Sequence, residues 1–164
     1  MKSIGFTLIE LIIILVIIGI LAVSVSPVFF DNSGTQSQVL RQRAMSILRS
    51  IQLQAMQDTN NCYIAVVEQN ALGEPTSKST DCSTGSLPAA GESPFTEENN
   101  RQIRDSGNVT FSLVGVSSLP GVIGFDVLGR PTGQCSGGCT ITLAENSGVS
   151  RNLCVNGEGY INEC

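Results

Sequence analysis

The chain contains no histidine among its 164 residues. Histidine is the commonest general base and the commonest neutral metal ligand, so its absence excludes Ser-His and Cys-His catalytic pairs. Basic residues are also scarce, because nine lysines and arginines face fourteen acidic residues, for a net charge of −5. Nucleic-acid binding depends on basic patches that neutralise phosphates. The composition therefore predicts neither an enzyme nor a nucleic-acid-binding protein, and it suggests no cofactor.

Charge is missing altogether from Leu11–Val23, and one acid, Glu10, stands directly before this run. A helix needs about 20 apolar residues to cross the hydrocarbon of a bilayer, and Phe6–Val25 supplies them. Lys2 is the only charge before Glu10, which predicts a cytoplasmic N-terminus and a translocated body. Because a carboxylate at the edge of such a helix is costly, Glu10 is expected to have a function there.

An ordinary secretory signal is the alternative interpretation of this segment. Lys2 would be its basic region, Leu11–Leu21 its apolar region and Ala22-Val23-Ser24 its cleavage site. Cleavage there would remove the whole segment and leave a secreted, cysteine-rich binding domain. Glu10 argues against this interpretation, since the apolar part of a signal avoids charge. The proposed cut also lacks a polar, loop-like stretch around it.

The residues Gly5-Phe6-Thr7-Leu8-Ile9-Glu10, followed by an aliphatic helix, resemble the class III signal of type IV pilins and type II secretion pseudopilins. The resemblance implies that a prepilin peptidase cuts between Gly5 and Phe6 on the cytoplasmic side and N-methylates Phe6. It also implies that the product crosses the inner membrane once, with a periplasmic head, before it enters a filament. The implied partners are the peptidase, other pilin or pseudopilin subunits, the inner membrane and its assembly platform.

Cleavage after Gly5 would create an α-amine at Phe6 that is largely protonated at neutral pH. By resemblance, Glu10 pairs with the Phe6 amine of an adjacent subunit during assembly, since a carboxylate that loses hydration gains from an opposite charge. Contact between Glu10 and lipid headgroups is the alternative. Pro27 removes one helical N–H and predicts a helix kink or a loosened segment.

Helical periodicity returns after Asp31-Asn32-Ser33-Gly34, where the helix either continues or breaks. Apolar residues at spacings of three and four predict an amphipathic helix packed on a head, which resembles the second half of the pilin helix. These residues are Leu40, Ala44, Ile47, Leu48, Ile51 and Ala55. Three arginines off this face predict a solvated or inter-subunit surface: Arg41, Arg43 and Arg49.

Beyond Cys62, short β-rich runs separated by turn residues predict an antiparallel, meandering β head. The expected strands are Cys62–Glu68, Asn108–Val114, Gly121–Val127, Cys139–Leu143, Arg151–Val155 and Gly159–Ile161. The predicted fold class is α+β, with a long N-terminal helix, transmembrane in its first half and amphipathic in its second, packed on this head. The expected domains are a leader at 1–5, a transmembrane and assembly helix at 6–30, an amphipathic helix at 31–58 and a periplasmic, disulfide-bonded β head at 59–164.

The pattern of the head resembles H-type minor pseudopilins and FimT-like minor pilins. Its ending, Leu153–Ile161, is similar to MSHA-pilus minor pilins of the C type. The resemblance implies a minor subunit that primes, initiates or modifies assembly of an MSHA-like type IV pilus. A minor pseudopilin of a type II secretion system is one alternative, and an adhesin at the filament tip is another.

Six cysteines lie beyond the apolar segment, an even number that indicates disulfides in a translocated domain. Fifteen connectivities are possible for six cysteines. The short-range pairing Cys62–Cys82, Cys135–Cys139 and Cys154–Cys164 is favoured, the last across a hairpin centred near Glu158. A zinc site formed by Cys135, Cys139, Cys154 and Cys164 is the alternative, although its spacing is loose for zinc, and no metal is expected.

Gln69–Gly107 is rich in Ser, Thr, Asn, Glu, Gly and Pro and has little apolar periodicity. Loops of this length are usually functional or disordered. A variable surface loop is the favoured interpretation, and partner binding is the second. Its acids, including Glu97-Glu98 and Asp105, do not have the ligand spacing of an EF-hand and are expected to be solvated.

Overall fold

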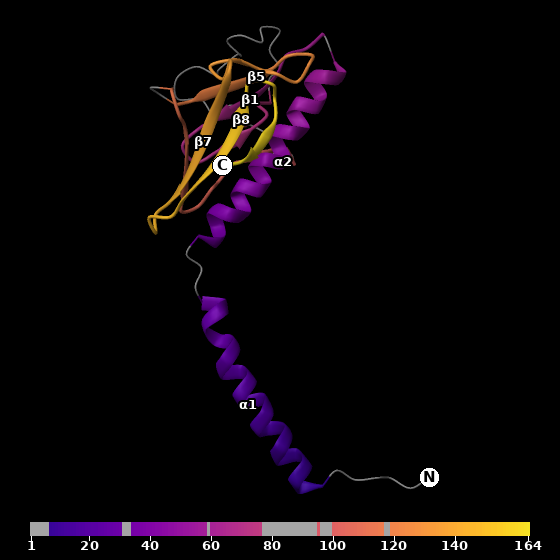
Figure 1. Ribbon diagram of the computed structural model, residues 1–164, viewed down its shortest axis with the longest axis vertical. Helices are drawn as coiled ribbons and strands as arrows, with labels where there is room; N and C mark the ends of the chain where they lie inside the picture. Colours follow the sequence, from indigo (N-terminus) through magenta and orange to yellow (C-terminus); the bar gives the residue numbers. More distant parts are fainter. Residues whose placement is uncertain (1–6, 31–33, 59, 77–94, 96–99, 117–118) are drawn as a thin grey trace, which may run out of the picture. The chain divides into compact units, whose positions relative to one another are not determined.

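The computed structural model describes residues 7–30, 34–58, 60–76, 95, 100–116 and 119–164, with the side chains of 22–30 excluded (Figure 1). The chain divides into two compact units, Met1–Ser33 and Gly34–Cys164. The first unit contains helix α1, and the second contains helix α2 and strands β1–β9. Each unit is described by itself, and the second is called the head.

Helix α1 spans Leu8–Phe30 and begins at a capped turn. The Thr7 hydroxyl accepts a hydrogen bond from the Glu10 N–H over 3.4 Å, and the Leu11 N–H donates to the Thr7 carbonyl over 3.3 Å. Thr7 and Glu10 have the spacing of a capping box. The Glu10 carboxylate also stands in the first turn, where it suits the positive end of the helix dipole. Glu10 therefore has a local role in starting α1.

Among the residues that the structure describes, no helix is at once long enough and apolar enough to cross a membrane. Gly5 and Phe6 lie outside the described residues. The side chain of Pro27 does so too, although its backbone falls within the bounds of α1. The membrane-spanning segment at 6–30 and the kink at Pro27 stay predictions.

Helix α2 spans Thr35–Gln57 and follows Gly34, whose φ of +81° favours glycine. The first turn of α2 carries neither an acidic residue nor a side-chain cap of its own. A distant carboxylate replaces them, because Glu145 Oε2 accepts hydrogen bonds from the Gly34 N–H (2.8 Å) and the Ser37 hydroxyl (3.2 Å). This contact joins the start of α2 to the end of a strand 108 residues away along the chain.

In the described part of the head, nine strands form two antiparallel sheets. The five-stranded sheet has the order β3-β2-β1-β5-β6, and the four-stranded sheet has the order β4-β7-β8-β9. Their bounds are β1 Tyr63–Val67, β2 Leu72–Gly73, β3 Gln102–Ile103, β4 Val109–Leu113, β5 Gly121–Phe125, β6 Pro131–Gly133, β7 Gly138–Glu145, β8 Ser150–Asn156 and β9 Ile161–Glu163.

The α+β class is confirmed, and a strand occurs at each of the six predicted places. The meander is only partly right, because β1 pairs with the distant β5, with Tyr63 opposite Phe125. Strands β2, β3 and β6 were not predicted. Strand β6 begins at Pro131 and lies at the edge of its sheet, where proline is tolerated.

The main hydrophobic core lies between α2 and the two sheets (Figure 1). Ala44, Leu48 and Ile51 of α2 are fully buried in it. Strand β1 contributes alternate residues, Tyr63, Ala65 and Val67, as the two-residue period of a strand requires. The predicted amphipathic helix and its apolar face are therefore confirmed, with Leu40 only partly buried.

A second, smaller core lies on the opposite face of the five-stranded sheet. Ile64 and Val66 of β1 and Val122 of β5 pack there with Ala71 and Phe95. The last two residues belong to the predicted surface loop Gln69–Gly107, which also contributes β2 and β3. The surface-loop interpretation is therefore wrong for these parts, which complete and cover the sheet.

The buried Phe95 gives a test of this correction, since it is only 2% exposed. Phe95→Ala should lower the free energy of unfolding by about 3–5 kcal/mol, the usual cost of emptying an aromatic core site. Tyr160→Ala is the matched control, because Tyr160 is an aromatic residue that is 64% exposed, and surface changes usually stay within about 0.5 kcal/mol. Urea unfolding followed by circular dichroism measures both, and equal effects would contradict the assignment of Phe95 to a core.

Candidate functional site

The described part of α1 is apolar on every side and uncovered within its unit. Every residue from Leu8 to Leu21 is exposed, and the large apolar side chains have exposed fractions between 42% and 75%. A helix that is hydrophobic all round is normally buried in protein or lipid. This surface therefore requires a covering that the chain's own unit does not supply.

Glu10 is the one charge on this described surface, and it is exposed. Its backbone N–H is bound to Thr7, and among the described residues no cation forms a salt bridge with its carboxylate. The predicted partner, the Phe6 amine, lies outside the described residues, as does the predicted cut between Gly5 and Phe6. The structure thus leaves the Glu10 carboxylate accessible to another molecule.

Two disulfides between described cysteines close short segments of the head. Cys135 pairs with Cys139, with Cα atoms 5.1 Å apart, and Cys154 pairs with Cys164, with Cα atoms 5.9 Å apart. Cys62 is disulfide-bonded, but Cys82 lies outside the described residues, so the Cys62–Cys82 pairing stays a prediction. All four cysteine sulfurs considered as zinc ligands are therefore held in disulfides. Within the described ranges, no cluster of Cys, Asp or Glu could hold a metal ion.

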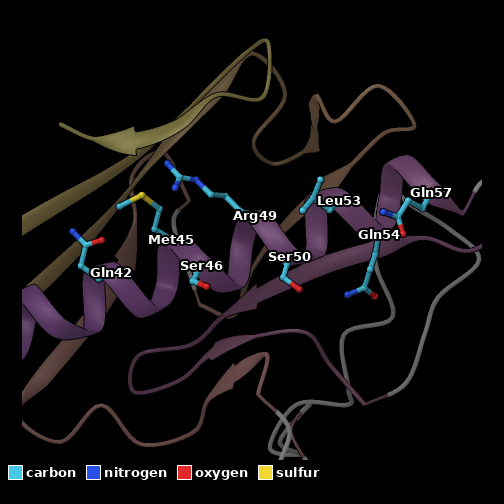
Figure 2. A pocket seen from close by; sticks show the side chains of 8 residues that line it. All are labelled: Gln42, Met45, Ser46, Arg49, Ser50, Leu53, Gln54 and Gln57. Atoms are coloured by element: carbon cyan, nitrogen blue, oxygen red, sulfur yellow. The ribbon is translucent and has the colours of Figure 1, made fainter.

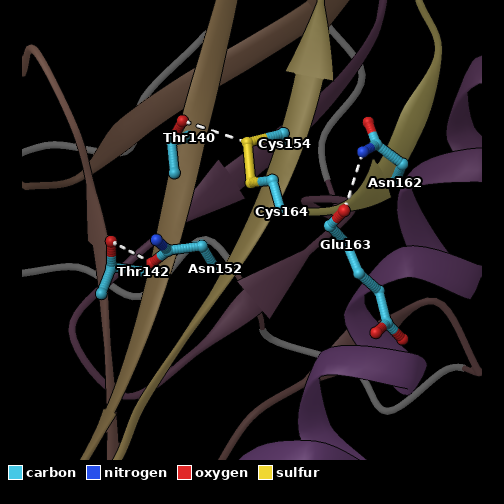
Figure 3. Close-up of a disulfide and its surroundings, with 7 residues drawn as sticks. All are labelled: Thr140, Thr142, Asn152, Cys154, Asn162, Glu163 and Cys164. Carbon is cyan, nitrogen blue, oxygen red and sulfur yellow. Dashed lines mark hydrogen bonds between the residues drawn. A yellow bond between two sulfur atoms is a disulfide. The ribbon is translucent and has the colours of Figure 1, made fainter.

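The C-terminal disulfide fixes the strand that clamps α2. Figure 3 shows Cys164 bonded to Cys154 of β8, with the Thr140 hydroxyl 3.4 Å from the Cys154 sulfur. Glu163, beside Cys164, accepts hydrogen bonds from the side chains of Arg41 and Gln42 on α2. The residues next to the disulfide therefore hold α2 against the head.

Arg41 corrects the prediction that all three arginines form a solvated or inter-subunit surface. It is only 8% exposed, and it forms a salt bridge with Glu163. Arg43 and Arg49 are exposed and donate to backbone carbonyls, of Gln102 over 2.9 Å and of Ile161 over 2.8 Å. The prediction therefore stands only for Arg43 and Arg49.

Two tight loops meet at the end of α2. Gln52 Nε2 donates to the carbonyls of Gly129 (2.6 Å) and Gly159 (2.7 Å) and so ties both loops to the helix. A Cβ atom at Gly159 would lie only 2.1 Å from the Gly129 carbonyl oxygen, so the close approach of the two loops requires glycine there. Nothing local in the sequence marks a glutamine that bridges two loops 30 residues apart, so the sequence did not predict this role of Gln52.

Asp126 and Asn156 stiffen these loops from within. The Asp126 carboxylate accepts hydrogen bonds from the N–H groups of Leu128 (2.9 Å) and Arg130 (2.8 Å) and pairs with the Arg130 guanidinium. Partial burial opposes ionisation, but these donors outweigh it and lower the pKa of Asp126. Asn156 Oδ1 accepts from the N–H groups of Glu158 and Tyr160 in the same way.

A groove of about 530 Å³ runs along the exposed side of α2. Figure 2 shows the side chains that line it along successive turns of the helix. They are Gln42, Met45, Ser46, Arg49, Ser50, Leu53, Gln54 and Gln57. The lining mixes amides and small hydroxyls with two apolar residues and a single charge. These eight lining residues include no carboxylate and no general base that could activate a serine hydroxyl for catalysis.

Comparison with known proteins identifies the N-terminal segment. Residues 1–26 match the family described as the prokaryotic N-terminal methylation motif. Two crystal forms of the type IV minor pilin FimU of Pseudomonas aeruginosa have a similar fold. One gives a TM-score of 0.50 at 15% identity, covering 77% of this chain and 91% of FimU. The other gives 0.51 at 14% identity, covering 81% and 91%.

The chain therefore carries an N-terminal methylation motif, and its fold is similar to that of a type IV minor pilin. The methylation motif supplies the N-terminal signature, and the FimU fold supplies the architecture of the rest. No curated protein sequence matches the chain. The motif and the fold agree with the prediction that the chain is a structural subunit and not an enzyme.

The Cys154–Cys164 disulfide should stabilise this protein chiefly by holding β9 in the position where Glu163 contacts α2. Its ten-residue separation corresponds to about 2–3 kcal/mol in the chain-entropy model. The double variant Cys154→Ser, Cys164→Ser should lose about this much, and amide hydrogen exchange should accelerate most in β9 and the first half of α2.

The variant Cys135→Ser, Cys139→Ser is the control, because that disulfide lies away from β9 and closes a shorter loop. If amide hydrogen exchange in α2 accelerates equally in both variants, the Cys154–Cys164 disulfide does not hold β9 against α2. Free-thiol titration of the purified native protein should find no free cysteine. If the titration finds four or more free thiols and the protein binds zinc, the disulfide assignment is wrong and the cysteines form a metal site.

Proposed function

We propose that this protein is a pilin, a minor subunit that primes, initiates or modifies the assembly of a type IV filament. The observation that carries the proposal is the methylation motif at 1–26, which overlaps a helix with uncovered apolar side chains. A separately folded head follows this helix along the chain. A filament subunit needs this arrangement, because the apolar helix can exchange a lipid covering for contact with other helices. The head can remain in water throughout this exchange.

The choice of a minor subunit is supported by the fold of FimU, which is a type IV minor pilin. An MSHA-like pilus is our preferred setting, on the pattern of Leu153–Ile161. A minor pseudopilin of a type II secretion system is the alternative. We infer that the helix at 6–30 holds the chain in the inner membrane and that the head at 59–164, with the amphipathic helix, faces the periplasm.

Glu10 has the position that assembly requires. Its carboxylate has no cationic partner among the described residues, and it lies about one helical turn from position 6. The proposed partner is the methylated Phe6 amine of a neighbouring subunit, formed when prepilin peptidase cuts after Gly5. Pairing would remove the cost of leaving a lone carboxylate in an apolar environment.

The mature protein should begin at an N-methylated Phe6. Gly5→Leu should block cleavage, because a bulky side chain would stand at the processed bond, and the chain should keep its leader. Mass spectrometry of the N-terminal peptide checks both forms. A mature N-terminus near Val25 would contradict the proposal and favour a secreted cysteine-rich binding domain.

A series of Glu10 variants separates the capping role from the pairing role. Glu10→Gln keeps a residue suited to the capping box but loses the charge, and Glu10→Val loses both. If pairing matters, both variants should insert into the membrane normally and reduce filament number by a similar, large factor.

The series is read by counting filaments in electron micrographs, with membrane fractions as the insertion control, in a strain that lacks other minor pilins. Normal filament numbers in Glu10→Gln and a loss only in Glu10→Val would show that capping, rather than pairing, is the role of Glu10.

A further inference from the structure

The two tight loops that meet at the end of α2 have the same hydrogen-bonding pattern. The first spans residues 126–130, and the second spans residues 156–160. In each loop the side chain of the first residue accepts hydrogen bonds from the N–H groups two and four positions later, and its backbone carbonyl accepts one from the glycine three positions later. The first loop begins with Asp126 and the second with Asn156. The second loop therefore holds an amide in a place that the first loop gives to a carboxylate.

Asn156 is followed by Gly157, and of all the asparagines in the chain it alone precedes a glycine. The backbone nitrogen after an asparagine can attack the side-chain amide carbon and close a five-membered ring, and a glycine has no side chain to hinder this approach. Asn156 is exposed, so water reaches its amide. Among the described residues, the Gly157 N–H donates to no backbone carbonyl. The nitrogen therefore has no such hydrogen bond to give up before it attacks.

The second loop also provides the donors that such an attack needs. Asn156 Oδ1 accepts hydrogen bonds from the N–H groups of Glu158 (3.1 Å) and Tyr160 (2.8 Å). As the nitrogen adds to the amide carbon, this oxygen becomes negative, and two fixed N–H groups stabilise it as the donors of an oxyanion hole do. The first loop shows the same preference, because desolvation opposes ionisation of Asp126, yet the N–H groups of the loop and the Arg130 guanidinium bring its pKa below the usual value. This type of loop therefore favours a negative oxygen at its first residue.

We propose that the pair Asn156 and Gly157 is a modification site, at which the folded head converts Asn156 to an aspartate without an enzyme. The Gly157 nitrogen forms a bond to Cγ of Asn156 and gives its proton to water. The bond between Cγ and Nδ2 then breaks, ammonia leaves with a proton from water, and a cyclic imide remains. Water adds to the imide and opens it. The reaction consumes water and releases ammonia, and it needs no oxidant, reductant or cofactor.

The loop accommodates one of the two products that the imide can give. Opening at Cγ leaves a normal aspartate, which can accept the same two N–H groups as Asp126 does in the first loop. Opening at the backbone carbonyl leaves isoaspartate, in which the main chain runs through the side chain and is one carbon longer. The longer chain would displace Gly159, whose close contact with Gly129 joins the two loops. The normal aspartate is therefore the product that preserves the fold.

The conversion changes the charge at this end of the head. The chain has a net charge of −5, and the new carboxylate adds a further negative charge beside the exposed Glu158. In the first loop Arg130 pairs with Asp126 over 2.9 Å, but the matching position of the second loop is Tyr160, which carries no positive charge. Because ammonia is lost, the reaction is irreversible, and the added charge marks the age of a chain. The proposal does not depend on the proposed function.

The test incubates the purified full chain, folded and with its disulfides intact, at neutral pH in water labelled with heavy oxygen, with samples taken over several weeks. Conversion replaces the amide nitrogen of Asn156 with one labelled oxygen, which raises the mass of its peptide by three units, and peptide fragmentation locates the change. We expect labelling at Asn156 and not at the exposed Asn146 or Asn152, which precede serine and leucine. An unlabelled Asn156, or equal labelling of the three asparagines, would overturn the proposal.

Two comparisons test whether the folded loop promotes the reaction. The chain unfolded in guanidinium chloride lacks the two fixed N–H donors and should convert no faster than the native chain. Ser147→Gly creates a second exposed asparagine–glycine pair at Asn146, outside the two loops. In this variant Asn156 should convert about tenfold faster than Asn146, since fixed donors at a developing oxyanion contribute strongly to the rate. A native rate below the unfolded rate, or an Asn146 that converts as fast as Asn156, would overturn the proposal.

Variants of the pair separate the chemistry from the fit of the product. Gly157→Ala should slow the labelling about tenfold or more, because small misplacements of reacting atoms are costly; unchanged labelling would contradict attack by this nitrogen. The added Cβ atom would lie 3.1 Å from the Gly137 carbonyl oxygen, so urea unfolding checks the fold of this variant. Asn156→Asp adds no atom to the loop and should unfold at the same urea concentration as the unmodified chain. Unfolding at a lower concentration would show that the loop does not accommodate the product.

Discussion

The head depends on the burial of one face of α2 against both sheets. Leu48 and Ile51 are fully buried in the main core, and the helix contacts strands of each sheet. Fully burying an aliphatic side chain contributes about 1.5–3 kcal/mol, so this face contributes more than its polar neighbours do. The polar contacts act mainly on geometry, since Glu145 sets where α2 begins and Gln52 sets how its far end meets two loops.

The two helices use apolar surface in opposite ways. In α2 the apolar residues form one stripe, which the sheets cover, and the opposite side keeps amides, serines and Arg49. In α1 the described apolar residues are exposed on all sides, and the single described charge is Glu10. One helix therefore completes the head, and the other needs a covering from outside its own unit. The filament subunit proposed above would use both helices in this way.

Sequence periodicity was enough for elements that bury a continuous face. The three- and four-residue spacing of Ala44, Leu48 and Ile51 predicted α2, and alternation or apolar runs predicted six of the strands. Strands β2 and β3 have two residues each, too few to show a period. Phe95 is a single apolar residue in a polar stretch, so its burial could not be seen before the fold brought it against Val66 and Val122.

The candidate site divides in the same way. The N-terminal motif is local, so Gly5, Phe6 and Glu10 could be named from the sequence. The groove could not be predicted in this way, because only the folded head decides which arginines of α2 form salt bridges with carboxylates. Arg41 finds Glu163, 122 residues away, and Arg49 finds only a carbonyl. The position of an arginine in the sequence of the helix does not show which of these two partners it will have.

The central proposal is that this protein is a minor filament subunit held by its uncovered apolar helix. The most direct measurement is quantitative mass spectrometry of filaments sheared from cells, compared with the membrane fraction and the medium. The account predicts the mature chain in the membrane and, at a small fraction of the amount of the major subunit, in the sheared filaments. A chain found only in the medium, or absent from filaments while present in the membrane, would contradict it.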